Sequence, residues 1–274
     1  MTTLSDYEYF RTPRGVLYCG PCETVMPMLE KVDLVVTSPP YGTLRDYDGY
    51  TFNFYQTAWQ IKRILKDGAV CVWVVGDETK NGSESGDSFR QALFFKAIGL
   101  NLHDTMIWNK GCFTSPQVVR YPNSFEYMFI VSKGTMAFCN QIKDRKNKKA
   151  GSSSIHTIRK RDGKTRNTYS DCRKTTIFNV GVRFNVWDIY PEQSSKNRVH
   201  PAIFPEKLAQ DHIISWSNPG DIVCDPMAGS GTVAKMADRL NRRWICIEIS
   251  ETYCKISKAR LELELSQPRL PGGF

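Results

Sequence analysis

A glycine-rich loop between a strand and a helix is the feature that most restricts the folds open to this chain. The apolar run Asp221-Ile-Val-Cys-Asp225 predicts a buried strand, and residues 225–232 then read Asp-Pro-Met-Ala-Gly-Ser-Gly-Thr. Gly229 and Gly231 permit a tight turn and a close approach of the backbone to a ligand, because glycine has no Cβ. A helical pattern and a second apolar strand follow this loop. The segment therefore predicts a β–α–β unit in a parallel sheet.

The same segment indicates what kind of ligand the loop holds. Glu248 ends the next strand, 19 residues after Gly229, where an acidic side chain accepts hydrogen bonds from the ribose hydroxyls of a nucleoside cofactor. The loop does not match a dinucleotide fingerprint, which would need glycine in place of Ala234, and it has no Gly-Lys-Ser/Thr phosphate motif. No basic residue lies between Asp225 and Ala234. The site therefore favours a neutral or cationic ligand, such as a sulfonium with an ammonium group, over a pyrophosphate.

The rest of the chain alternates between strand and helix patterns, which is typical of an α/β protein with a doubly wound, three-layer sheet. We expect strands at 33–37, 69–75, 105–108, 127–131 and 244–249, and helices at 57–65, 88–98, 206–216, 231–240 and 253–265. The order is interrupted once, so we predict one catalytic domain from residues 1–139 and 181–266, an insertion at 140–180 and a flexible tail at 267–274.

The positive charge of the chain is concentrated in that insertion. The whole chain carries a net charge of +9, and residues 141–174 alone contain 12 Lys or Arg against 3 Asp, which is also +9. Such a segment is typical of a contact with a nucleic-acid backbone, although the run of small residues at 151–154 also fits a solvated loop. We predict DNA contacts at Lys143, Arg145, Lys146, Lys148, Lys149, Arg159, Lys160 and Arg161.

A second loop, Thr37-Ser-Pro-Pro-Tyr-Gly42, follows the strand at 33–37. The exocyclic amine of a nucleobase is a poor nucleophile, because its lone pair is delocalised into the ring. Acceptors for both amine hydrogens draw the nitrogen toward tetrahedral geometry, and the Ser38 hydroxyl and the Pro39 carbonyl suit this role. Pro40 stiffens the loop and has no N–H, and Tyr41 offers a face on which a base flipped out of the duplex can stack.

The cysteines give no support for another chemistry. The nine cysteines are scattered, which argues against a disulfide framework. Cys19-Gly-Pro-Cys22 has the spacing of a redox pair, but Pro27 interrupts the helix that such a pair requires, and no second pair completes a zinc site. The first ten residues do not resemble a signal peptide, and the longest apolar run is far too short to span a membrane. We therefore expect a cytoplasmic protein without a metal.

Taken together, the two loops resemble the motifs of the DNA amino-methyltransferases of restriction–modification systems. This family carries Asp/Asn/Ser-Pro-Pro-Tyr/Phe as its catalytic motif and Asp-Pro-Phe-x-Gly-Ser-Gly-Thr as its cofactor motif, and this chain has Met227 in place of the Phe. His200-Pro-Ala-Ile-Phe-Pro205 is similar to the segment that completes the cofactor pocket. The motif order is that of the permuted class called β, in which the basic insertion recognises the target.

The resemblance implies a Rossmann-like methyltransferase fold and S-adenosyl-L-methionine as the cofactor. It implies catalytic roles for Ser38, Pro39, Pro40 and Tyr41. It implies cofactor contacts from Phe204, Pro205, Asp225, Met227, Gly229, Ser230, Gly231, Thr232 and Glu248. The implied partner is double-stranded DNA, with a cognate restriction endonuclease and a homodimer left open.

The target base is indicated by the first residue of the catalytic motif. Family members with Ser at this position mostly methylate N4 of cytosine, and Arg45-Asp-Tyr47, where Arg45 is a further expected DNA contact, also resembles that branch. The alternative is methylation of adenine N6. Two functions of different classes are also open: a catalytically silent DNA-binding protein, which the intact motifs disfavour, and a nicotinamide oxidoreductase, which the missing third glycine disfavours.

Overall fold

The computed structural model describes residues 2–40, 52–112, 119–154, 157–159, 162, 165–167, 175–191 and 204–267. The chain divides into two compact units. One unit consists of Met1–Asn140 and Asn185–Phe274, and the other of Gln141–Phe184, which overlaps the insertion predicted at 140–180.

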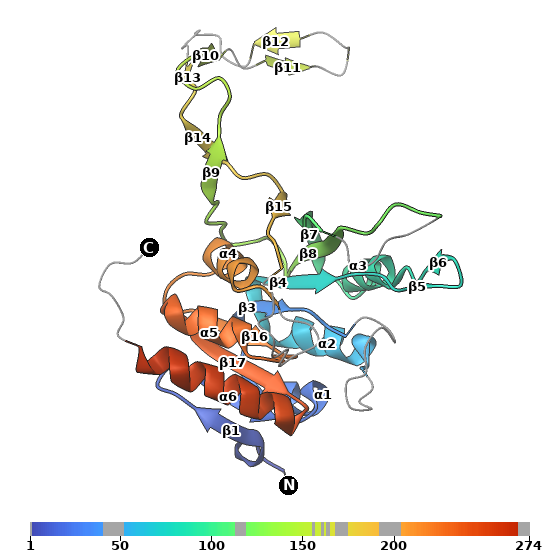
Figure 1. The fold of residues 1–274 in the computed structure, drawn as a ribbon, viewed down its shortest axis with the longest axis vertical. Coiled ribbons are helices and arrows are strands. Elements are labelled where there is room, and N and C mark those ends of the chain that lie inside the picture. Colours follow the sequence, from blue (N-terminus) through green and yellow to red (C-terminus); the bar gives the residue numbers. More distant parts are fainter. Residues whose placement is uncertain are drawn as a thin grey trace. The chain divides into compact units, whose positions relative to one another are not determined.

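The larger unit is built on one mixed sheet (Figure 1). Its described strands are β1 (Glu8–Arg11), β2 (Gly15–Cys19), β3 (Val32–Thr37), β4 (Leu65–Val75), β7 (Asn101–Asn109), β8 (Phe125–Ser132), β15 (Val186–Asp188), β16 (Ile222–Asp225) and β17 (Arg243–Glu248). They lie in the order β1-β2-β17-β16-β3-β4-β8-β7-β15. The strands from β2 to β4 in this order are parallel, whereas β1 and β8 run antiparallel to their neighbours. The predicted α/β class is confirmed, in a sheet that also contains antiparallel strands.

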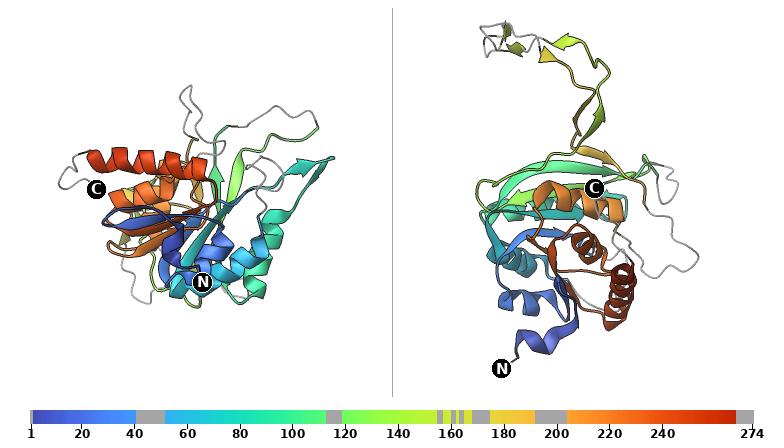
Figure 2. Two further views of the ribbon diagram at one scale, coloured as in Figure 1. Left: turned by 90° about the horizontal axis from the view of Figure 1, so that it is seen from below. Right: turned by 90° about the vertical axis from the view of Figure 1, so that its left-hand side faces the viewer.

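Helices cover both faces of this sheet (Figures 1 and 2). Those described are α1 (Cys22–Val25), α2 (Phe54–Ile64), α3 (Asp87–Ala97), α4 (Glu206–Trp216), α5 (Thr232–Arg239) and α6 (Glu251–Ser266), with short 3₁₀ helices at Leu4–Tyr7 and Met26–Met28. Residues of α1 to α3 belong to one buried cluster and residues of α4 to α6 to the other. The architecture is therefore three-layered, as predicted. No helix within the described part of the chain is long and apolar enough to cross a membrane.

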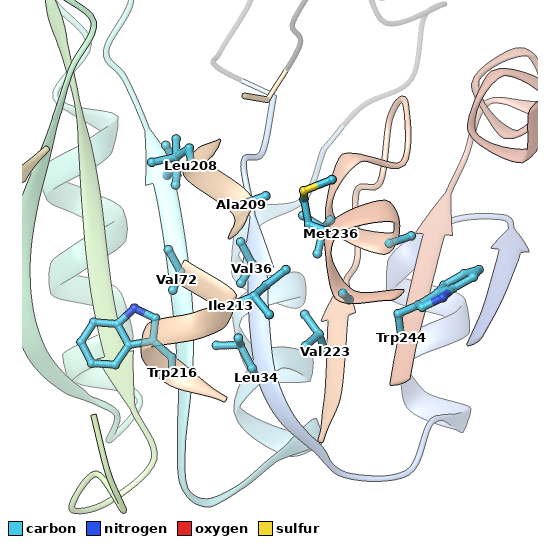
Figure 3. Packing of buried hydrophobic residues seen from close by; sticks show 14 of the residues in the cluster. Leu34, Val36, Val72, Leu208, Ala209, Ile213, Trp216, Val223, Met236 and Trp244 are labelled. Carbon is cyan, nitrogen blue, oxygen red and sulfur yellow. The ribbon is translucent and has the colours of Figure 1, made fainter. Parts of the chain in front are cut away.

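The two clusters explain why the central strands read as unbroken apolar runs. Successive side chains of a strand point to opposite faces, so a strand covered on both sides needs apolar residues at every position. In β3, Leu34 and Val36 pack in the cluster of α4 to α6, and Val35 between them packs in the cluster of α1 to α3. Figure 3 shows Ile213 of α4 among the side chains of these strands.

The element boundaries differ from the predicted ones mainly where a long-range strand pair extends an element. β4 begins at Leu65 rather than at Ala69, because Leu65 pairs with Val32 of β3. The helix predicted at 57–65 begins at Phe54, where the Asn53 side chain accepts a hydrogen bond of 3.1 Å from the backbone N–H of Gln56. Strands β1 and β15 and the small hairpin β5 (Thr79–Lys80) with β6 (Ser83–Glu84) were not predicted.

The smaller unit consists of paired strands. β9 (Lys143–Lys146) pairs with β14 (Val180–Val182), β10 (Ser153–Ser154) with β13 (Thr175–Thr176), and β11 (Thr157–Arg159) with β12 (Thr165–Asn167), all antiparallel. A segment with few large apolar residues is thus held by backbone ladders, which composition alone does not predict.

Candidate functional site

The predicted catalytic and cofactor loops lie next to each other at one edge of the sheet. β3, β16 and β17 are neighbouring parallel strands, so their carboxyl ends, Thr37, Asp225 and Glu248, share an edge. Open α/β sheets bind ligands outside this edge. Ser38 is half-buried and Pro39 is buried directly after Thr37.

A direct hydrogen bond joins the two loops. Thr37 Oγ1 donates to Asp225 Oδ1 at 2.7 Å, and the backbone N–H of Met227 donates to the same oxygen at 3.1 Å. Asp225 is 5% exposed. Burial raises the pKa of Asp225 to about 7; the hydrogen bonds from Thr37 and Met227 lower it, and the Glu248 charge raises it. This carboxyl therefore titrates near neutral pH.

Glu248 orients the glycine-rich loop through backbone amides. Its Oε2 accepts a hydrogen bond of 2.7 Å from the N–H of Gly229, and its Oε1 accepts one of 3.0 Å from the N–H of Ser250. A carboxylate can accept several hydrogen bonds through its two oxygens, so its chemistry also suits a ligand hydroxyl. Glu248 is thus both a structural anchor of the loop and a candidate ligand for ribose.

The two loop glycines have positive φ, and Gly231 is required by packing as well. The φ angles are +51° at Gly229 and +76° at Gly231, in the region that favours glycine. A Cβ on Gly231 would lie 2.0 Å from Ser257 Oγ of α6. Gly231 therefore also approaches the protein's own helix closely, and its predicted contact with a ligand stays a prediction.

Arg260 of α6 binds the glycine-rich loop through several hydrogen bonds, and the sequence did not predict this role. Its Nη1 donates to the Ser230 carbonyl at 2.8 Å, to Ser230 Oγ at 2.7 Å and to Thr232 Oγ1 at 3.2 Å. Its Nη2 donates to Glu206 Oε1 at 3.1 Å. Ser230 and Thr232, predicted as cofactor contacts, thus direct their side chains to Arg260. An arginine on a helix rich in Lys and Glu gave no local signal of this role.

The segment before α4 reaches the same network. Pro205 is the N-cap residue of α4, and Phe204 is half-buried against the cluster of α4 to α6. Glu206, the first residue of α4, also accepts a hydrogen bond of 2.6 Å from Lys235 of α5. Met227 is half-buried against the opposite cluster.

The cysteine pair is unsuited to redox chemistry in this fold. Helix α1 has only four residues, and burial raises the pKa of the Cys22 thiol to about 12. A thiol that remains protonated is a poor nucleophile. Among the described residues, no group of three or more His, Cys, Asp or Glu side chains is placed to hold a metal ion.

Of the predicted DNA contacts, the lysines near β9 are exposed, whereas Arg145 contacts other residues of the unit Gln141–Phe184. Arg145 Nε donates to the Val182 carbonyl at 2.9 Å, and its guanidinium lies 4.4 Å from the centre of the Phe184 ring. The exposed residues are Lys143, Lys146, Lys148 and Lys149. The predicted site residues that fall outside the described residues or side chains are Tyr41, Arg45, Arg159, Lys160 and Arg161.

Similarity to known proteins extends over most of the chain. The family model described as DNA methylase matches residues 32–259. The orphan methyltransferase M.BamHII of Bacillus amyloliquefaciens is 52% identical, over 84% of this chain and 89% of that protein. PvuII DNA methyltransferase (cytosine-N4-specific) shares the fold with a TM-score of 0.64 at 20% identity, over 93% of this chain and 88% of the other. A complex of TTHA0409 of Thermus thermophilus with S-adenosyl-L-methionine has the same fold, with a TM-score of 0.60 at 22% identity. The match covers 95% of this chain and 97% of the other.

Proposed function

This chain belongs to the DNA methylase family, and from that premise we propose that it transfers a methyl group from S-adenosyl-L-methionine to N4 of cytosine in double-stranded DNA. The hydrogen bond between Thr37 and Asp225 carries the proposal, because it places the Ser-Pro-Pro loop beside the glycine-rich loop. A transfer between two bound molecules requires their sites to adjoin.

S-adenosyl-L-methionine is the cofactor, and the residues at the sheet edge fit its chemistry. Asp225 and Glu248 are two buried carboxyls at the ends of adjacent strands, and they accept hydrogen bonds from the Thr37 hydroxyl and from backbone amides. They suit a cofactor that carries positive charge and ribose hydroxyls. When bound, the cofactor supplies an electrophilic methyl group. Met227, whose backbone N–H bonds to Asp225, offers apolar surface next to this acid, and we propose that Phe204 adds apolar surface to the same pocket.

The Ser-Pro-Pro loop would prepare the acceptor amine. The Ser38 hydroxyl and the Pro39 carbonyl accept the two amine hydrogens, which returns the lone pair to nitrogen as it becomes tetrahedral. Once it gains the methyl group, the nitrogen would carry a positive charge and be acidic, so its proton would pass to solvent water without a strong base. Tyr41 would stack on the flipped base.

Cytosine N4 is favoured over adenine N6 by Ser38 at the first position of the motif, where the sequence resembles the N4 branch. Both bases present a conjugated exocyclic amine, so the same loop chemistry would serve an adenine. Adenine N6 is therefore the second candidate.

The product base can be identified directly. We would express the chain in a methylation-free host, digest the DNA to nucleosides and quantify the methylated bases by mass spectrometry, with Ser38→Ala, whose methyl transfer should be slower by about 10²–10³-fold, as the comparison. N4-methylcytosine is the expected product. N6-methyladenine would refute the cytosine assignment and retain the mechanism, and unmethylated DNA with intact cofactor and DNA binding would favour the silent DNA-binding protein.

We further propose that the unit Gln141–Phe184 contacts the DNA target. This is supported by the excess of basic residues in 141–174 and by the exposure of the lysines near β9. Phosphate contacts by lysines position a protein on DNA without reading its sequence.

A further inference from the structure

One aromatic side chain in the smaller unit is almost fully exposed although its backbone is firmly held. Phe178 is 81% exposed. Its carbonyl accepts a hydrogen bond of 2.9 Å from the Asn147 side chain, and the Asn147 backbone N–H donates to the Asn179 carbonyl at 2.9 Å. On the other side, Ile177 and Ser152 are joined by a hydrogen bond of 2.9 Å from the Ile177 N–H. The backbone at Phe178 is therefore held on both sides, while its ring is left exposed to solvent.

The same hydrogen bonds place a turn with two lysines across from the backbone of Phe178. Asn147 pairs on one side of Phe178 and Ser152 on the other, so the residues between them form a turn that faces Phe178. The Ser152 hydroxyl closes the turn by donating to the Lys149 carbonyl at 2.7 Å. Lys148 and Lys149 lie in this turn and are exposed.

The exposed surface continues along β14. Val180 is 46% exposed and pairs in register with Lys146 of β9, which is also exposed. Directly paired residues of two strands present their side chains on the same face. Val180 and Lys146 therefore place apolar surface beside positive charge, and we call the exposed residues of this ribbon, Lys146, Lys148, Lys149, Phe178 and Val180, the ribbon surface.

A second exposed aromatic residue of this unit, Phe184, contacts a cation within the unit. It is 65% exposed, but the Arg145 guanidinium lies 4.4 Å from the centre of its ring. Such a cation over a ring face is a stabilising contact. Phe184 thus stabilises the unit through Arg145, whereas the ring of Phe178 is exposed.

A partner for the ribbon surface must offer negative charge and apolar surface side by side. Duplex DNA does so, because phosphates border grooves in which base edges, sugar carbons and thymine methyls are accessible. Proteins that bind grooves also insert phenylalanine or other apolar side chains between base steps. The excess of basic residues in 141–174 and membership of a family that acts on DNA both favour DNA over a protein partner.

We propose that Phe178 is a DNA-contacting residue whose ring packs against bases or sugars in a groove, while the lysines of the ribbon surface neutralise the flanking phosphates. This inference rests on the proposed DNA role of the unit Gln141–Phe184 and adds an apolar, salt-independent component to it.

Salt dependence separates the two kinds of contact. We would measure binding of the full chain to labelled, sheared duplex DNA from a methylation-free host over a series of salt concentrations. Phe178→Ala should lower the affinity about tenfold at every salt concentration and leave the slope of log K against log salt unchanged. Lys148→Gln and Lys149→Gln should each reduce that slope by about 0.9. Leu263→Ala, a truncation of an apolar residue on α6 that is 64% exposed, is the control and should bind as the wild type.

Each contrary result has a distinct meaning. If Phe178→Ala binds DNA as tightly as the wild type at all salt concentrations, and the wild type itself shows the expected salt dependence, this inference is wrong but the proposed DNA role is not. A loss of affinity that disappears at high salt also overturns it, because the effect would then arise from displaced charges. If Phe178→Ala keeps its DNA affinity but alters self-association in sedimentation, the ring belongs to a protein contact. A wild-type chain that does not bind DNA refutes the proposed DNA role as well. Unchanged thermal unfolding of Phe178→Ala is the check on its fold.

Discussion

Thr37 Oγ1 lies 2.7 Å from Asp225 Oδ1, and this hydrogen bond connects two loops that are 188 residues apart in the chain. Thr37 immediately precedes Ser38, and Asp225 begins the glycine-rich loop. Both residues are buried, at 1% and 5% exposure, so the bond is shielded from water. A change at either end is therefore expected to affect the other loop.

Removal of the Thr37 hydroxyl should weaken this connection. Thr37→Val, which retains the shape, should reduce both cofactor affinity and the rate of methyl transfer, and Thr37→Ser should restore both. A double-mutant cycle with Asp225→Ala, which removes the acceptor, should give a coupling free energy of about 1 kcal/mol. Additive effects of the two substitutions would show that the loops are not coupled through this bond.

The acidic side chains should contribute to cofactor binding. Asp225→Ala and Glu248→Ala are each expected to weaken S-adenosyl-L-methionine binding by roughly 1–3 kcal/mol, the value of a charge-assisted hydrogen bond. DNA affinity should change little. Glu262→Ala, at an exposed acid on α6, is the control. Wild-type cofactor affinity in both variants, measured by calorimetry, would remove these carboxyls from the site.

The pKa of Asp225 predicts a pH dependence with opposite signs for stability and for binding. Its folded-state pKa of about 7 lies above the ordinary value of 3.8, so its contribution to the free energy of unfolding is largest at low pH and is lost as the pH rises through 7. A cationic cofactor favours the ionised carboxylate, so its affinity should increase between about pH 6 and pH 8. Calorimetry over this interval should show the increase in the wild type and a flatter profile in Asp225→Asn.

Arg260 should act on cofactor binding through the loop that it holds. Arg260→Ala is expected to weaken cofactor binding about tenfold, the effect of losing roughly one to two net hydrogen bonds, with less effect on kcat than on the KM for the cofactor. Arg239→Ala is a matched control, because Arg239 pairs with Glu264 and Glu206 without contacting the loop in any hydrogen bond described for it. Equal losses in both variants would assign Arg260 to helix packing alone. Partial recovery of the KM in Arg260→Lys would support the positioning role.

Ser38 should affect chemistry rather than binding. An acceptor whose bond strengthens only as the amine nitrogen becomes tetrahedral stabilises the transition state specifically. Ser38→Ala should therefore lower single-turnover methyl transfer about 10²–10³-fold, with cofactor and DNA affinities nearly unchanged. A wild-type rate in this variant would make the Ser-Pro-Pro loop a structural turn.

The sequence by itself determined most of the central strands and helices of this protein, although not all of their boundaries. The apolar runs of β3 and β4, the start and end of α4, and the glycine-rich loop were all predicted, because each depends on side chains within a few positions of one another. Periodicity and turn chemistry are local properties. The α/β class followed from their alternation.

Only the tertiary structure decided which of these residues meet. The order of strands placed Thr37 against Asp225, and the packing of α6 placed Arg260 on Ser230 and Ser257 beneath Gly231. Long-range ladders also organised the basic insertion as paired strands. Such contacts join residues tens to hundreds of positions apart, and a single sequence carries no local pattern that specifies them, because their geometry arises only when the sheet and its helices pack together.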